Sequence, residues 1–267
     1  MNIDLYQVDA FASKPFEGNP AAVCPLEAWL DDGLLQAIAT ENNLSETAFF
    51  VPTESGYHLR WFTPAVEVDL CGHATLAAAW VIFNELGESA ETLHFETRSG
   101  LLLVQRDGDE LAMDFPAKTL EPLAMHTEVA SALGGINIEE LLISDDIVVV
   151  VNNAQLIESL EPDMQQLKRL PGRGIVVTAK GHDTDFVSRW FGPKVGVEED
   201  PVTGSAHTSL APYWAKRLGK QQLTARQGGA RKGTLSCVVE GDRVMIKGRV
   251  APYLNGSITL PNSHPAG

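Results

Sequence analysis

The pentapeptide RWFTP at residues 60–64 returns as RWFGP at residues 189–193, an offset of 129 residues. Further matches follow in the same order: GHA at 72–74 with GSA at 204–206, and DGD at 107–109 with EGD at 240–242. The offset grows slowly, to 133 residues at the last match, as it does in a duplication with small insertions. The sequence therefore predicts two similar halves.

Each half reads as strand, loop, helix and further strands. The central helices are expected at 73–86 and 206–218; the first carries no charge before Glu85, which indicates burial nearly all round. Pro212 predicts a kink or a shifted start in the second. Strands are expected at 58–62, 101–105, 110–115, 185–191, 234–239 and 243–249, and amphipathic surface helices at 26–40 and 155–170.

These elements predict an α+β fold of two pseudo-symmetric halves, each a curved β-sheet or barrel wrapped around a central helix. The N-terminal half is expected at residues 1–117, joined by a C-terminal strand at 254–267. The C-terminal half is expected at 118–253, with the link near 116–123, where two prolines follow the last strand.

Composition and charge limit the function classes. With 44% hydrophobic and 21% charged residues the chain reads as globular rather than disordered. A net charge of −15 argues against a nucleic acid or an anionic membrane as partner, but not against a small anionic metabolite. No signal sequence or membrane-spanning run is visible, and the three cysteines are widely spaced, so a cytoplasmic protein with reduced thiols is expected.

The most informative segments are the two glycine loops that enter the central helices, CGHA at 71–74 and TGSA at 203–206. Glycine lets the backbone approach a ligand, and the first N–H groups of a helix lack partners within the helix. Clefts between domains are common ligand sites, so two such helix starts facing one cleft would bind an anion. A single glycine would indicate only a tight turn; the duplicated pair favours function.

Other candidate residues have ordinary explanations as well. His73 at a helix start suits a neutral, hydrogen-bonding role, although a packed or capping histidine is nearly as common there. Ser205 fits a helix N-cap. Glu46 lies between a surface helix and an apolar strand, where a carboxylate can end up partly buried, although a solvated charge at a strand end is the more common arrangement there. No nucleotide, nicotinamide or zinc signature is present, so neither a cofactor nor a metal is expected.

Four motifs, in order, resemble the phenazine-biosynthesis-like (PhzF-like) isomerase family: DAF at 9–11 with GNPAAV at 18–23, NLSET at 43–47, CGHA at 71–74, and EDPVTGSA at 199–206. That family shares its duplicated fold with diaminopimelate epimerase and proline racemase. The resemblance spans nearly the whole chain. It implies an active site between the two halves, and a homodimer.

The resemblance also implies roles at the matching positions. The residues concerned are Glu46, His73, Asp200 and Ser205 as catalytic groups, and Asn19, Gly72 and Gly204 as substrate-binding groups. Glu46 would be the acid/base, and the two glycines would supply backbone donors.

One departure bears on the reaction type. Racemases of this fold place a cysteine at the front of both glycine loops, whereas this chain has Cys71 in one loop and Thr203 in the other. Inverting a stereocentre needs a base on each face, while a proton shift along a conjugated system needs only one carboxylate. The sequence therefore favours a cofactor-independent isomerase acting on a small cyclic or unsaturated carboxylic acid. The alternatives are an epimerase that uses Cys71 as one base and a non-catalytic binding protein.

Overall fold

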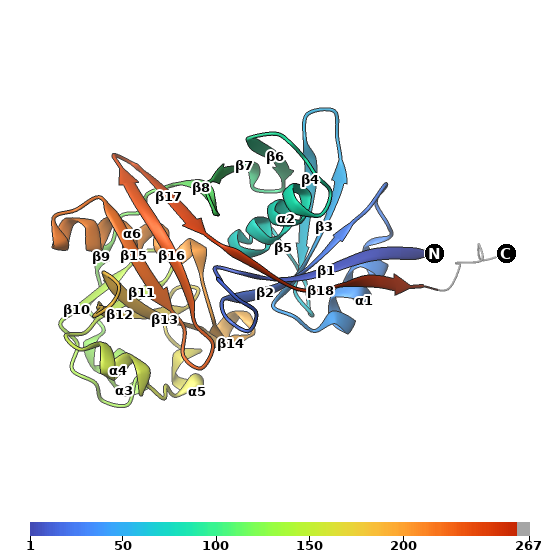
Figure 1. Ribbon diagram of the computed structural model, residues 1–267. Coiled ribbons are helices and arrows are strands. Elements are labelled where there is room, and N and C mark those ends of the chain that lie inside the picture. Colours follow the sequence, from blue (N-terminus) through green and yellow to red (C-terminus); the bar gives the residue numbers. More distant parts are fainter. Residues whose placement is uncertain (261–267) are drawn as a thin grey trace. The chain divides into compact units, whose positions relative to one another are not determined.

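The computed structural model of the chain describes residues 1–260, and its internal contacts divide the chain into two compact units (Figure 1). Unit 1 contains Met1–Phe16, Pro20–Met113 and the residues from Arg249 onward; unit 2 contains Glu17–Asn19 and Asp114–Gly248. The expected boundaries were 117/118 and 253/254. Residues 261–267 of the expected C-terminal strand lie outside the described residues.

The elements of unit 1 are β1 (Asn2–Ala10), β2 (Asn19–Pro25), α1 (Asp32–Asn42), β3 (Glu46–Pro52), β4 (Tyr57–Phe62), β5 (Glu67–Val68), α2 (Gly72–Asn84), β6 (Thr92–Thr97), β7 (Gly100–Asp107), β8 (Glu110–Pro116) and β18 (Val250–Thr259). Strand β18 pairs with β1 in antiparallel register along its length. This pairing ties the end of the described chain to its beginning. Strands β2 and β8 each cross a boundary between the units.

The elements of unit 2 are β9 (Glu121–Pro122), α3 (His126–Ala132), β10 (Glu140–Ile143), β11 (Ile147–Val150), α4 (Ala154–Glu158), α5 (Met164–Leu167), β12 (Ile175–Lys180), β13 (Phe186–Gly192), η1 (Pro193–Val195), β14 (Val197–Asp200), α6 (Gly204–Leu218), β15 (Gln222–Gln227), β16 (Gly233–Glu240) and β17 (Arg243–Gly248). A core that includes Val149, Val177 and Phe191 lies between its strands and helices α3 to α5.

The predicted duplication is confirmed by the strand order. In unit 1 the pairs β2–β3, β3–β4, β4–β6 and β6–β7 are parallel, antiparallel, parallel and antiparallel. In unit 2 the pairs β11–β12, β12–β13, β13–β15 and β15–β16 follow the same sequence of directions. The repeated RWF tripeptide ends β4 in one unit and lies within β13 in the other.

Both central helices are buried along much of their length, as their apolar sequences predict. Helix α2 is buried over most of its length and packs against β1, β3 and β18. Helix α6 packs against β15, β16 and β17 and runs on through Pro212. Because Pro212 has no N–H, it leaves the carbonyl of Thr208 without its helical partner. The backbone N–H of Lys118 donates to that carbonyl at 2.9 Å, so the proline leaves no buried polar group unpaired.

Both expected surface helices differ from the prediction. The segment expected at 26–40 becomes helical only at Asp32, because the Asp31 side chain accepts from the Gly33 N–H and caps the helix there. The single helix expected at 155–170 is two short helices, α4 and α5. Pro162 interrupts the helix. The Asp163 side chain then caps a new helix, α5, by accepting from the N–H groups of Gln165 and Gln166.

Among residues 1–260, no helix has both the length and the apolar character needed to cross a bilayer.

Candidate functional site

The candidate acid/base Glu46 lies beside His73 in unit 1. Glu46 is the first residue of β3, and His73 is the second residue of α2. Glu46 Oε2 is 3.0 Å from His73 Nε2, and the two side chains are 15% and 6% exposed. A strand start and a helix start thus place a carboxylate and an imidazole in direct contact within a mostly buried environment.

Cys71 completes this cluster from the other side of the imidazole. Its Sγ lies 3.5 Å from His73 Nδ1, and its carbonyl accepts from the N–H and the hydroxyl of Thr75. Burial, followed by the charge of Glu46, raises the pKa of the Cys71 thiol to about 11. The thiol is therefore protonated near neutral pH, which makes it a poor proton acceptor.

The environment of His73 departs from the neutral ring expected at a helix start. Burial opposes protonation, but the neighbouring Cys71 and Glu46 outweigh it and raise the pKa of His73 well above its ordinary value. A protonated ring presents Nε2–H to the Glu46 carboxylate and Nδ1–H to the Cys71 sulfur. The imidazole of His73 therefore fixes the orientation of the Glu46 carboxylate that it contacts.

The same three side chains offer metal-ligand atoms within 4.8 Å of one another. Carboxylate, imidazole and thiolate are ligands that zinc accepts. However, Cys71 contacts Nδ1 and Glu46 contacts Nε2, which are on opposite sides of the ring. One ion bound by all three residues would require the imidazole to move, so the three side chains as they lie form a row, with His73 between Glu46 and Cys71.

In unit 2 the second glycine loop is held by the Asp200 carboxylate. Asp200 Oδ1 accepts from Asn19 Nδ2 at 2.6 Å, and Asp200 Oδ2 accepts from the Thr203 hydroxyl at 2.6 Å. Asn19 Nδ2 also donates to the Val202 carbonyl, and Gln227, fully buried, contacts both Thr203 and the Asp200 carbonyl. The loop that leads into α6 is thereby fixed on both sides.

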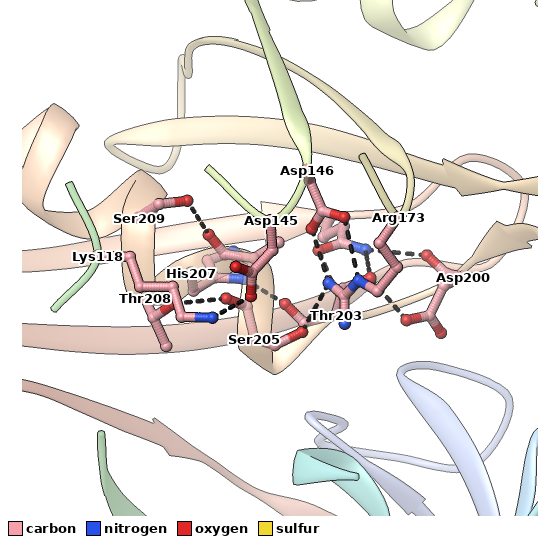
Figure 2. A network of polar contacts seen from close by, with 12 residues as sticks. Lys118, Asp145, Asp146, Arg173, Asp200, Thr203, Ser205, His207, Thr208 and Ser209 are labelled. Atoms are coloured by element: carbon pink, nitrogen blue, oxygen red, sulfur yellow. Dashed lines mark hydrogen bonds and ion pairs between the residues drawn. The ribbon is translucent and has the colours of Figure 1, made fainter. Parts of the chain in front are cut away.

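Ser205 is the second residue of α6 rather than its N-cap, which is Thr203. The Ser205 hydroxyl accepts from Arg173 Nη2 at 3.0 Å, and Arg173 is also bound to Asp146 (Figure 2). Ser205 is therefore linked to a charged pair instead of capping its own helix.

The structure thus groups the predicted residues in two sets. The first set belongs to unit 1 and lies at or beside the start of α2. It contains Glu46, Gly72, which is the first residue of α2, and His73, which is the second. The unit 2 set surrounds the start of α6: Asn19, Asp200, Gly204 and Ser205. How these residues act on a substrate stays a prediction.

Sequence reasoning missed two residues that contact this second set, Arg173 and Gln227, and also Asp146, which binds Arg173. All three are far from the motifs in the sequence. The only signal available was the pair of glycines flanking Arg173 in PGRG at 171–174, which indicates a tightly packed loop.

Comparison with known proteins gives consistent matches over most of the chain. The family model described as phenazine biosynthesis-like protein matches residues 8–256. An uncharacterized isomerase of Pseudomonas aeruginosa is 62% identical over 260 residues, covering 97% of this chain and all of the relative. The crystal structure of a PhzF-family phenazine biosynthesis protein from Enterococcus faecalis matches with a TM-score of 0.95 and 46% identity, covering 97% of this chain and all of that one.

Structures with much lower sequence identity also share the fold. A hydroxyproline epimerase from Agrobacterium vitis matches with a TM-score of 0.64 at 12% identity, covering 99% of this chain and 93% of that one. At that identity the likeness shows the fold alone, which is the epimerase-like duplicated architecture expected from the sequence.

Proposed function

The chain belongs to the phenazine biosynthesis-like family and is an isomerase, and from this premise we propose that it shifts a proton between two carbons of a small carboxylic acid. In this proposal Glu46 is the single acid/base and no cofactor takes part. The substrate is cyclic or unsaturated, because only a conjugated system allows a proton removed at one carbon to be returned at another.

The observation that carries the proposal is the contact of 3.0 Å between Glu46 Oε2 and His73 Nε2 in a mostly buried setting. The carboxylate accepts the proton from the first carbon, and the electron pair left behind spreads over the conjugated system. The hydrogen of the resulting carboxylic acid exchanges with solvent, and the acid then gives a proton to the second carbon, so substrate and product have the same composition. Proton transfer by a positioned carboxylate accelerates such steps by about two to four orders of magnitude.

The state of Cys71 supports a carboxylate over a thiolate as the base. With a pKa of about 11 the thiol stays protonated near neutral pH, and the matching position in the second loop is Thr203, which cannot act as a thiolate. A two-base epimerase mechanism would need a thiolate at one of these positions. The single-carboxylate isomerisation needs neither.

The test is an incubation of a mixture of small carboxylic acids in deuterium oxide, followed by mass spectrometry. The wild-type protein should introduce deuterium into its substrate, and Glu46→Gln should lower the rate by about two to four orders of magnitude, since the amide keeps the size but not the basicity. Glu54→Gln is the matched control, because Glu54 is exposed in the same unit and should leave the rate unchanged.

Full exchange by a folded Glu46→Gln protein would end the assignment of Glu46. If the wild type exchanges no hydrogen in any acid that it binds, the protein acts as a binding protein on this fold instead.

A further inference from the structure

A surface cavity of unit 1 lies where the end of α2 meets strands β1 and β18, which run side by side (Figure 1). Its volume is about 180 Å³, many times the roughly 10–15 Å³ that one water molecule requires. Three aromatic residues, Tyr6, Trp80 and Tyr253, line it together with the acidic residue Glu85. The cavity therefore has room for a small molecule, and its lining combines rings with a carboxylate.

A β-bulge places Tyr253 at this cavity. The register of β1 and β18 shifts between Gln7 and Val8, so that Tyr253 is an extra residue without a counterpart in β1. The ring of Phe16 packs edge-on against the ring of Tyr253, and the two ring centres are 5.4 Å apart. Tyr253 thus keeps 48% of its surface exposed while a second ring supports it.

Trp80 differs from the other four tryptophans of the chain. Trp29, Trp190 and Trp214 each have an arginine guanidinium over the ring, at 5.1, 5.3 and 5.6 Å from the ring centre. Trp61 is only 1% exposed, so its ring is out of reach of a ligand. Trp80 is partly exposed, and among residues 1–260 no arginine or lysine lies over its ring. Its ring is therefore available to a cation from solution.

The charge at the cavity is negative. The Glu85 carboxylate is exposed and has no hydrogen bond or ion pair with another of residues 1–260. Burial, followed by the charges of Asp4 and Glu85, raises the pKa of the Tyr6 hydroxyl, so both carboxylates act at that ring. Arg106, a cation near the end of α2, is engaged elsewhere: it lies 4.0 Å over the Phe83 ring and donates to the Phe83 carbonyl. None of the described residues that line the cavity is basic.

We infer that this cavity is a binding site for a small organic cation that carries a quaternary ammonium group. The face of an aromatic ring is negative and attracts such a cation, and several rings around one site add their attractions. Tyr6, Trp80 and Tyr253 contact the methyl groups of the cation, and Glu85 balances its charge. The site thus selects a cation over a neutral molecule of the same shape.

A quaternary ammonium group fits this lining better than a primary amine does. A primary ammonium group has three hydrogens that need acceptors, whereas Glu85 is the one carboxylate among the described residues of the lining. A quaternary nitrogen donates no hydrogen bond and needs only the rings and the charge. The cavity is also separate from the Glu46 cluster, because Trp80 follows His73 by about two turns of α2, roughly 10 Å along the helix axis. The inference therefore does not depend on the proposed function.

The experiment compares the binding of choline with that of 3,3-dimethylbutan-1-ol, in which a carbon atom replaces the charged nitrogen. Isothermal titration of the full chain at low ionic strength gives both dissociation constants. Choline should bind about tenfold more tightly than the alcohol, and Trp80→Leu should remove most of this preference, since leucine is apolar but has no ring. Glu85→Gln should weaken choline binding by about two- to fivefold, as expected for an exposed charge, and leave the alcohol unaffected. Glu54→Gln is the matched control, with the same charge change at an exposed position of unit 1.

Circular dichroism checks that each variant is folded. If Trp80→Leu does not fold, Tyr253→Leu takes its place, because that side chain lies at the surface and its loss leaves the core intact. Unchanged choline affinity in the folded aromatic variant or in Glu85→Gln would overturn the inference. Equal affinity of the wild type for choline and the alcohol would do so as well, and so would the absence of saturable choline binding up to about 0.1 M.

Discussion

At the scale of single residues, the side chains of Glu46, His73 and Cys71 contact one another. The imidazole of His73 stands between the carboxylate and the thiol, with 3.0 Å to one and 3.5 Å to the other. The sequence singled out all three positions, because two belong to a glycine loop and the third to a recognisable motif. It did not predict the raised pKa of His73, since the helix-start argument omits the neighbouring Cys71 and Glu46.

Substitution of Cys71 separates the two enzyme mechanisms. With its pKa near 11 the thiol is a protonated, buried side chain, so Cys71→Ala should keep most of the turnover of an identified substrate. Steady-state rates and hydrogen exchange in deuterium oxide are the measurements. Iodoacetamide should have little effect on the wild type, because the reactive thiolate is scarce and the sulfur is buried.

If Cys71→Ala remained folded and lost both exchange and turnover, the thiolate would be the base and the single-carboxylate mechanism would be wrong.

At the scale of elements, the sequence predicts the long apolar helices correctly. It misses helix boundaries that single capping side chains or prolines set. The central helices follow from long apolar runs bounded by glycine, and the structure begins both at those glycines. The expected helix at 155–170 is wrong because the pattern of apolar residues continues across Pro162, while the chain restarts at Asp163. Periodicity alone carries no information about such a restart.

Helix α6 also contains a titratable group that links its stability to pH. His207 is fully buried, and its Nδ1–H donates to the Thr203 carbonyl at 2.9 Å. Burial, only partly opposed by that hydrogen bond, lowers the pKa of His207 to about 4. The unfolded chain takes up a proton near pH 6.5 and the folded chain only near pH 4, so protonation favours unfolding between these values.

The contribution of His207 should therefore be complete above about pH 6.5 and should decline as the pH falls toward 4, by about 3 kcal/mol of unfolding free energy in total. His207→Asn keeps a donor near the Nδ1 position but does not titrate. Urea unfolding at several pH values should show a smaller loss between pH 7 and pH 4.5 in this variant than in the wild type. Equal losses in the two proteins would contradict the assignment of His207.

At the scale of the whole molecule, the duplication was predictable because the repeated segments keep their order and their spacing. Of the candidate residues, His73 and Ser205 lie in those segments, whereas Glu46 and Asp200 were singled out by the motifs of the family resemblance. Arg173 and Asp146 were not predictable, since they come from loops without a motif. Arg173 binds Asp146 and Ser205 only in the folded unit. Long-range hydrogen bonds of this kind leave no pattern in a single sequence.

The most direct test of the central claim, a proton shift by one carboxylate, is the position of deuterium in the product. The reaction of an identified substrate is run in deuterium oxide, and NMR locates the labelled carbon and its configuration. The account predicts deuterium on a carbon other than the one that lost its hydrogen, with the double bond moved accordingly. Deuterium on the same carbon with inverted configuration and no movement of a double bond would contradict it.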